Sequence, residues 1–197
     1  MMEGIVDDNI MTKTNQETLP NGDYNVHVLK INTPDQANYN TEINKTYKKG
    51  KNAGRKFDLI LVTLEVHPES HSDFARRWLT LKLFVTTDCK DYDEFKTINK
   101  PWMYFLVNSG YMDSTDNPVM YPTCYNEIKD NLEKFVGLPL CVKVEENPHW
   151  TDSTKLLNKV DFVNPWHDAA QYIPKENKQA MNQNAETFKE EDDDLPF

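Results

Sequence analysis

The stretches Lys56–Val66 (KFDLILVTLEV) and Trp78–Val85 (WLTLKLFV) decide the fold class of this chain. Both are rich in β-branched and aliphatic residues, and the polar connection HPESHSDFARR separates them, so they predict two strands. The second stretch alternates strictly, with one set of side chains on a common face: Leu79, Leu81, Leu83 and Val85. This set predicts the face of the strand that packs in the core. The side chains on the opposite face are then candidates for binding.

Three further strands and two helical segments are expected around this pair. The strands are predicted at Tyr24–Ile31, Leu138–Val144 and Leu157–Val163. The helices are predicted at Glu94–Ser109, interrupted at Pro101, and at Asn126–Val136, which ends before Gly137. Their order, with helices between the third and fourth strands, is that of an OB fold. The chain is therefore expected to be mainly β with minor α: a five-stranded OB-like barrel with inserted helices.

Composition divides the 197 residues into three parts. Residues 1–18 are polar without periodicity and predict a flexible N-terminal arm. Residues 19–174 hold the expected strands and helices and predict the OB-like domain. Residues 175–197 are dominated by Gln, Asn, Lys and acids, a composition that buries too little apolar surface to fold. They predict a disordered acidic C-terminal tail.

A basic segment lies between the first two predicted strands. Residues Asn32–Arg55 are rich in Asn, Lys, Thr and Gly, too long for an ordinary loop in a compact domain. A β-ribbon arm or a solvated flexible loop are the alternatives. Its cations and interleaved rings suit phosphates and bases, and OB folds bind oligonucleotides with this loop. The candidate nucleic-acid-binding residues here are Tyr39, Lys45, Tyr47, Lys48, Lys49, Lys51, Arg55 and Lys56.

The second face of the Trp78–Val85 strand supplies further candidates. Trp78, Lys82 and Phe84 share that face, and Arg76 and Arg77 come just before it. Large rings opposite a Leu/Val core either bind a ligand or are covered by the helices, and the sequence leaves both alternatives open. Trp150, in the loop between the last two strands, is a further candidate for contacting nucleic acid.

Three rings in the first helical segment have a different expected role. Trp102, Tyr104 and Phe105 lie close together in the predicted helix. We expect these residues to belong to the hydrophobic core.

The last residues of the chain carry a distinctive pattern. The chain ends in Glu190-Glu191-Asp192-Asp193-Asp194-Leu195-Pro196-Phe197, and residues 186–197 contain six acids and one Lys within a total net charge of −10. The tip Asp192–Phe197 resembles the C-terminal tip of bacterial single-stranded DNA-binding proteins, and the layout of residues 19–174 resembles phage-encoded DNA-binding proteins with OB-like domains. The resemblance implies that single-stranded DNA and replication, repair and recombination proteins are the partners.

The tip also makes physical sense as a ligand. A partner can bury the Phe197 ring and hold the adjacent carboxylate with Arg or Lys, while the acids steer the tail towards basic surfaces. Pro196 restricts the backbone and so reduces the entropy lost on docking. A merely solubilising tail is the alternative for the acidic run, although it leaves the terminal Leu-Pro-Phe unexplained.

No catalytic, metal or cofactor site is predicted. The chain has no GxxxxGK[ST], HExxH or GxSxG motif. His67 and His71 are four residues apart, but the segment starts His-Pro and has no Cys or His near it in sequence. Three unpaired-looking cysteines favour a reducing compartment. We therefore expect a non-enzymatic protein without a cofactor.

Two functions follow from these features. The first is a sequence-independent single-stranded DNA-binding protein that protects the strand and recruits partners through its tip. The second is an interaction protein that mimics such a tip to capture or block host tail-binding factors without binding DNA. The acidic N-terminal residues and the lack of a long apolar run predict a soluble cytoplasmic protein, and the resemblance implies that the cell is a bacterial host. The sequence leaves homo-oligomerisation open.

Overall fold

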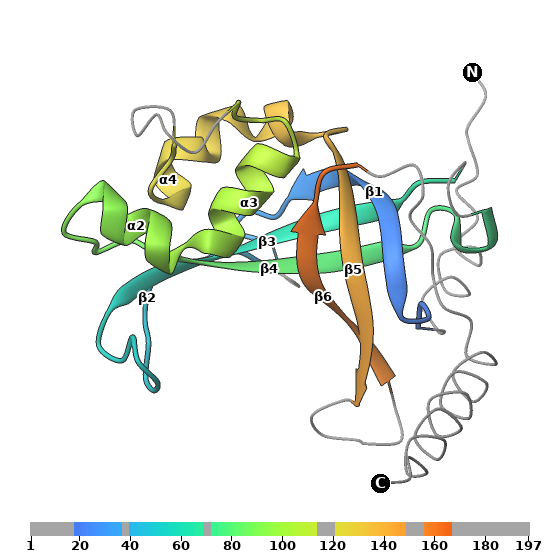
Figure 1. The fold of residues 1–197 in the computed structure, drawn as a ribbon. Coiled ribbons are helices and arrows are strands. Elements are labelled where there is room, and N and C mark those ends of the chain that lie inside the picture. The colour runs from blue at the N-terminus through green and yellow to red at the C-terminus, as the bar shows by residue number, and fades with distance from the viewer. Residues whose placement is uncertain (1–17, 37–39, 69–71, 114–120, 149–155, 167–197) are drawn as a thin grey trace, which may run out of the picture.

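A computed structural model describes residues 18–36, 40–68, 72–113, 121–148 and 156–166 of the chain. Within these residues the protein is mainly β, as predicted. One antiparallel six-stranded sheet curls into a half-barrel, and short α-helices cover one side of it (Figure 1). In the described part of the chain, every helix is too short or too polar to cross a lipid bilayer.

The strands agree closely with the sequence, with one addition. They are β1 (Gly22–Ile31), β2 (Glu42–Thr46), β3 (Lys56–Val66), β4 (Trp78–Thr86), β5 (Pro139–Pro148) and β6 (Leu156–Asn164). The added strand β2 lies in the basic segment and pairs antiparallel with β3. The β-ribbon alternative for this segment is therefore the observed one, and we call residues 42–56 the arm. The arm projects away from the helices (Figure 1).

Strand β3 organises the sheet. One of its edges pairs with β4 from Phe57 to Glu65. Its other edge is shared, because β2 pairs with its beginning and β1 with its end. The path then continues from β1 to β5 and β6. Because successive side chains of a strand point to opposite faces of the sheet, inward and outward side chains alternate along β3 and β4. Leu61 and Thr86, on the outward side, are nevertheless buried.

The first predicted helical segment, expected to be interrupted at Pro101, consists of two helices. They are α2 (Tyr92–Ile98) and α3 (Lys100–Asn108). The Asp91 carboxylate caps α2 by accepting the Glu94 N–H at 2.8 Å. Between the helices, the buried Asn99 side chain accepts the Thr86 N–H at 2.7 Å and donates to the Thr86 carbonyl at 3.0 Å. Asn99 therefore ties the junction of the two helices to the end of β4.

The second predicted helix, over 126–136, is only partly correct. The α-helix α4 spans Tyr125–Ile128 and continues as the 3₁₀ helix η3 (Lys129–Phe135). The backbone of Asn131 leaves helical geometry (φ −133°, ψ 23°), which breaks the α-helical hydrogen-bond ladder. Another 3₁₀ helix, η1 (Ser72–Phe74), lies in the connection between β3 and β4.

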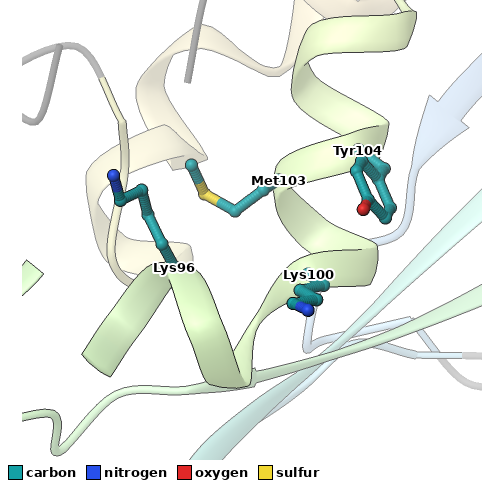
Figure 2. A pocket seen from close by; sticks show the side chains of 4 residues that line it. All are labelled: Lys96, Lys100, Met103 and Tyr104. Carbon is teal, nitrogen blue, oxygen red and sulfur yellow. The ribbon is translucent and has the colours of Figure 1, made fainter. Parts of the chain in front are cut away.

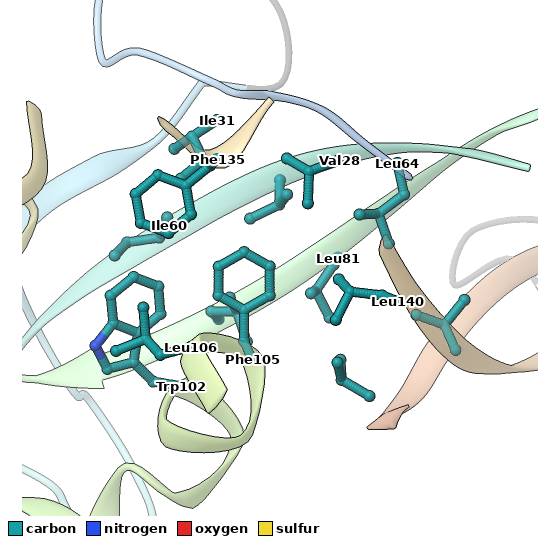
Figure 3. Packing of buried hydrophobic residues seen from close by; sticks show 14 of the residues in the cluster. Val28, Ile31, Ile60, Leu64, Leu81, Trp102, Phe105, Leu106, Phe135 and Leu140 are labelled. Atoms are coloured by element: carbon teal, nitrogen blue, oxygen red, sulfur yellow. The ribbon is translucent and has the colours of Figure 1, made fainter. Parts of the chain in front are cut away.

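The core lies between the inner face of the sheet and the helices. The predicted inward set of β4, Leu79, Leu81, Leu83 and Val85, is buried as expected. It packs with side chains of β3 and with Trp102, Phe105 and Leu106 of α3 (Figure 3). The prediction that Tyr104 belongs to this core is wrong. Its side chain is 45% exposed, because Trp102, Phe105 and Leu106 occupy the i, i+3, i+4 face that meets the sheet.

A buried carboxylate joins the arm to the body of the protein. Asp58 on β3 is 3% exposed. Its Oδ1 accepts the Asn44 N–H of the arm at 2.9 Å, and its Oδ2 accepts the Tyr125 N–H at the start of α4 at 2.8 Å. Asn44 has φ 53°, and the register between β2 and β3 shifts at this point. Asp58 thus holds a bulged edge strand and a helix to the same point on β3.

We expect Asp58→Ala to lower the free energy of unfolding by about 3 kcal/mol, because two backbone donors lose a charged acceptor. Urea unfolding followed by circular dichroism measures this change. The control is Asp93→Ala, since the Asp93 side chain is 93% exposed and should change stability by no more than about 0.5 kcal/mol. Equal stability of the Asp58 and Asp93 variants would contradict the assigned role.

Candidate nucleic-acid interface

The outward side chains of β3 and β4 form one continuous ladder. Because the two strands pair without a shift, residues opposite each other point to the same side of the sheet. The outward pairs, in order from the arm, are Phe57–Thr86, Leu59–Phe84, Leu61–Lys82, Thr63–Thr80 and Glu65–Trp78. At about 3.3 Å per residue the ladder is about 26 Å long. We call this surface the outer face.

Two predicted rings are open on the outer face. Trp78 is 48% exposed and Phe84 is 47% exposed. The alternative in which helices cover these rings is therefore wrong, since the helices pack on the inner face (Figure 1). Lys82 is exposed between them on the same strand. The result is an aromatic, cationic, aromatic sequence along one edge strand.

The rings continue from the outer face into the arm. The Phe57 and Phe84 ring centroids are 5.7 Å apart, and Tyr47 stacks on Phe57 at 4.2 Å with an interplanar angle of 28°. Tyr47 and Phe84 are among the residues predicted from the sequence to contact DNA, but Phe57 is not. Phe57 is an outward residue in the alternation of β3, and it lies next to the lysine-rich loop. This position could have identified it from the sequence.

The tip of the arm is a closed turn that carries free lysines. The Tyr47 N–H donates to the Arg55 carbonyl at 3.0 Å, and the Gly54 N–H donates to the Tyr47 carbonyl at 2.8 Å. Gly50 and Gly54 have φ of 85° and 86°, a conformation that favours glycine. Within and beside this turn the exposed cations are Lys48, Lys49, Lys51 and Lys56. Lys45 is exposed too, but its Nζ lies 2.9 Å from a Glu42 carboxylate oxygen.

Arg55, one of the predicted DNA-contacting cations, makes ion pairs within the protein. Its Nε lies 3.2 Å from Asp88 Oδ1, its Nη1 lies 3.0 Å from Glu94 Oε1, and its Nη2 donates to the Asp88 carbonyl at 3.0 Å. The Lys56 N–H also donates to Asp88 Oδ2 at 3.0 Å. Arg55 therefore fastens the base of the arm to α2, and its guanidinium is already occupied by carboxylates.

Of the remaining residues predicted to bind DNA or a partner protein, the structure describes Arg76 and Arg77. Arg76 is exposed and has φ 60°, and Arg77 is half-buried, both directly before Trp78. They add positive charge at the far end of the outer face. Three of the predicted sites lie outside the described residues: Tyr39, Trp150 and the tip Asp192–Phe197.

A second ring group, which sequence reasoning missed, lies at this far end. His27 of β1, His67 after β3 and Trp166 after β6 have ring centroids 4.8–5.5 Å apart. Burial lowers the pKa of His27, and the nearby His67 lowers it further, against an opposing effect of Glu65. These rings come from three distant parts of the chain, so no local pattern could have grouped them.

The helical side offers little chemistry by comparison. A shallow hollow of about 190 Å³ is lined by Lys96, Lys100, Met103 and Tyr104 between α2 and α3 (Figure 2). Among the residues described, no three His, Cys, Asp or Glu side chains gather as a metal site would require. The cysteines Cys89, Cys124 and Cys141 are free thiols. His71, one of the two histidines considered above, lies outside the described residues.

No known protein-family model matches the chain, and no curated protein matches its sequence.

Arg55→Ala should lower the melting temperature at pH 7, with a difference from wild type that shrinks in acid. Hydrogen bonds hold the pKa of Glu94 below 4.5, chiefly from the Lys90 N–H and then from Arg55, and the pKa of Asp88 below 3.8, chiefly from the Lys56 N–H and then from Arg55. A depressed carboxyl pKa stabilises the fold above the unfolded-state pKa, and this contribution disappears as pH falls through the folded-state pKa.

Thermal unfolding of wild type and variant from pH 7 down to about pH 3 measures this effect. Lys51→Ala is the control, because Lys51 is an exposed arm cation and should leave the melting temperature nearly unchanged at every pH. If the difference in melting temperature between wild type and Arg55→Ala stayed constant as the pH falls, the assignment of these ion pairs would be contradicted.

Proposed function

We propose that this protein binds single-stranded DNA, without sequence preference over most of its site, along the outer face and the arm. The observation that carries the proposal is that two open rings and a lysine lie on the sheet surface opposite the core, next to the lysines of the arm. Phe84, Lys82 and Trp78 follow one another on β4, and Tyr47 and Phe57 extend the row into the arm. Unpaired bases stack on such rings whatever their identity, while lysines contact the phosphates.

The strand order supports an OB-type reading of the half-barrel. Along the sheet the order is β4, β3, β1, β5 and β6, β6 also approaches β4, and the helices follow β4 in the chain. An OB fold is a five-stranded Greek-key barrel, and in this comparison β2 is an addition in its first loop. In that reading the outer face of β3 and β4 is the surface that OB folds use for oligonucleotides.

The arm fits the role of a phosphate-binding flank. It brings four exposed lysines, Lys48, Lys49, Lys51 and Lys56, to one end of the outer face. Each phosphate that a lysine neutralises releases condensed counterions, so binding weakens as salt rises. Asp58 and Arg55 anchor the arm at its base, and this reduces the entropy that would be lost in ordering it around a strand.

The tail has the second role in this proposal. Asp192–Phe197 recruits replication, repair and recombination proteins by offering acids, an aromatic ring and a carboxylate to a basic, apolar pocket. The support for this role is the sequence pattern of the tip. While the tip is unoccupied, the tail's negative charge competes with DNA for the protein's own lysines.

Fluorescence anisotropy with labelled oligo-dT tests the proposal, and Phe84→Ala against Tyr104→Ala is the sharpest comparison. The two rings are 47% and 45% exposed, but Phe84 lies on the outer face and Tyr104 on α3 on the helical side. Phe84→Ala should weaken binding by about 1–3 kcal/mol, the contribution of one stacked base. Tyr104→Ala should leave the affinity unchanged.

Equal loss in both variants would contradict the placement of the strand. The absence of salt-sensitive oligo-dT binding by the full chain would contradict the proposed function itself. That second result would favour the alternative of a tip that captures host factors without DNA.

Removing Glu190–Phe197 should strengthen oligo-dT binding at low salt. The deletion removes five acids that compete with phosphates for the arm lysines, and the gain should fade as salt screens the tail. Anisotropy titrations at two salt concentrations measure both effects. An affinity that does not change at low salt would contradict the competition between tail and DNA.

A further inference from the structure

The far end of the outer face holds a carboxylate between rings. Strand register places His27 of β1 and Trp78 of β4 on either side of Glu65 of β3. Residues opposite each other in such a register share one side of the sheet. The three side chains therefore form one row across three strands.

Aromatic surface surrounds this row. On one side Trp78 is 48% exposed. On the other side His27, His67 and Trp166 contact one another edge to face or tilted, with ring centroids 4.8–5.5 Å apart. A flat ligand that stacks on Trp78 would place one edge beside Glu65, with the His27–His67–Trp166 group on the far side of that carboxylate.

Glu65 itself is half-buried and uncommitted. Within the described residues the structure gives its carboxylate no hydrogen-bond or ion-pair partner. The pKa of His27 is lowered, first by burial and then by His67, against an opposing effect of Glu65, so the charged imidazole that could pair with Glu65 is disfavoured. A half-buried carboxylate with free acceptor oxygens costs desolvation energy that a ligand's donors can recover.

We propose that Glu65, flanked by Trp78 and by the His27–His67–Trp166 group, is a nucleobase subsite that favours guanine. The inference rests on the proposed function and adds a local preference to an otherwise sequence-independent site. A carboxylate is an acceptor only, with two oxygens in one plane. Guanine presents two parallel donors on its Watson–Crick edge, N1–H and N2–H, which match those oxygens in a fork.

The other bases fit this subsite less well. Cytosine and adenine each offer one amino group beside a ring acceptor that the carboxylate repels. Thymine offers a single N–H between two carbonyl oxygens, both of which face the carboxylate unfavourably. Each base can still stack on Trp78, so the preference is a matter of degree and leaves general binding intact.

The test compares three oligonucleotides of about 20 nucleotides, longer than the usual site of one OB domain. They are oligo-dT, oligo-dT with guanines spaced singly, and the same sequence with inosine in place of guanine, which lacks the 2-amino group. Wild type should bind the guanine oligonucleotide about tenfold more tightly than oligo-dT. The inosine oligonucleotide should fall between the two.

Glu65→Gln should reduce the guanine-to-thymine affinity ratio to near one, because an amide offers one acceptor oxygen and a competing donor. Asp93→Asn is the matched control, since it removes the same charge from α2 on the helical side, where the Asp93 side chain is 93% exposed and pairs only with Lys96 among the described residues. It should shift all three affinities together and leave the ratio unchanged. Trp166→Ala should lower the ratio and Trp166→Phe should retain it, which separates ring contact from folding defects.

The outcomes distinguish the two proposals. A wild-type protein that binds all three oligonucleotides equally well keeps the proposed function and overturns the guanine subsite. A ratio that survives Glu65→Gln also overturns it. A wild-type protein that binds none of them overturns the proposed function, and the subsite with it.

Discussion

The unbroken antiparallel register between β3 and β4, from Phe57–Thr86 to Glu65–Trp78, is the constraint on which the rest of the structure depends. It assigns Leu79, Leu81 and Leu83 to the core and Trp78, Lys82 and Phe84 to the outside. A slip of one residue would exchange the two sets and bury a lysine among the leucines. The hydrophobic effect that fixes the core therefore also fixes the order of rings and charges outside. The candidate interface is in this sense a consequence of core packing.

The arm depends on two anchors that act on different parts of it. Asp58 holds the bulged strand β2 through a backbone N–H of the arm, and Arg55 holds the base of the turn through Asp88 and Glu94 of the body. Between these anchors the turn Tyr47–Arg55 closes on itself through backbone hydrogen bonds. The lysines on the turn keep the freedom of their long side chains while the backbone that carries them is held. This arrangement suits contact with phosphates. A lysine can contact a phosphate in many side-chain geometries, but the attraction is stronger where several positive charges are held close together.

Much of this could be predicted from the sequence where the determining signal is local. The alternation in Trp78–Val85 identified both faces of β4, and the lysine-rich composition identified the arm. Local patterns failed where a residue's partner is distant. Arg55 resembles the lysines around it in sequence, and only folding brings it to Asp88 and Glu94. The group of His27, His67 and Trp166 is likewise assembled from three segments by the sheet. The short polar strand β2 has no hydrophobic alternation of its own, because it lies at an edge and its register is set by Asp58 and β3.

An acidic chain can still offer a surface for a polyanion, because electrostatic attraction acts over a limited range. At physiological ionic strength exposed charges are screened beyond about 8 Å, so a strand near the arm responds to the local lysines more than to the net charge of −10. Stacking adds a component that salt affects little, since the interaction of a base with Phe84 or Trp78 involves no net charge. A face that combines the rings Trp78 and Phe84 with Lys82 therefore needs fewer cations than one that relies on charge alone. Under the proposed function, fewer cations would also let the acids of the tail compete with DNA for them.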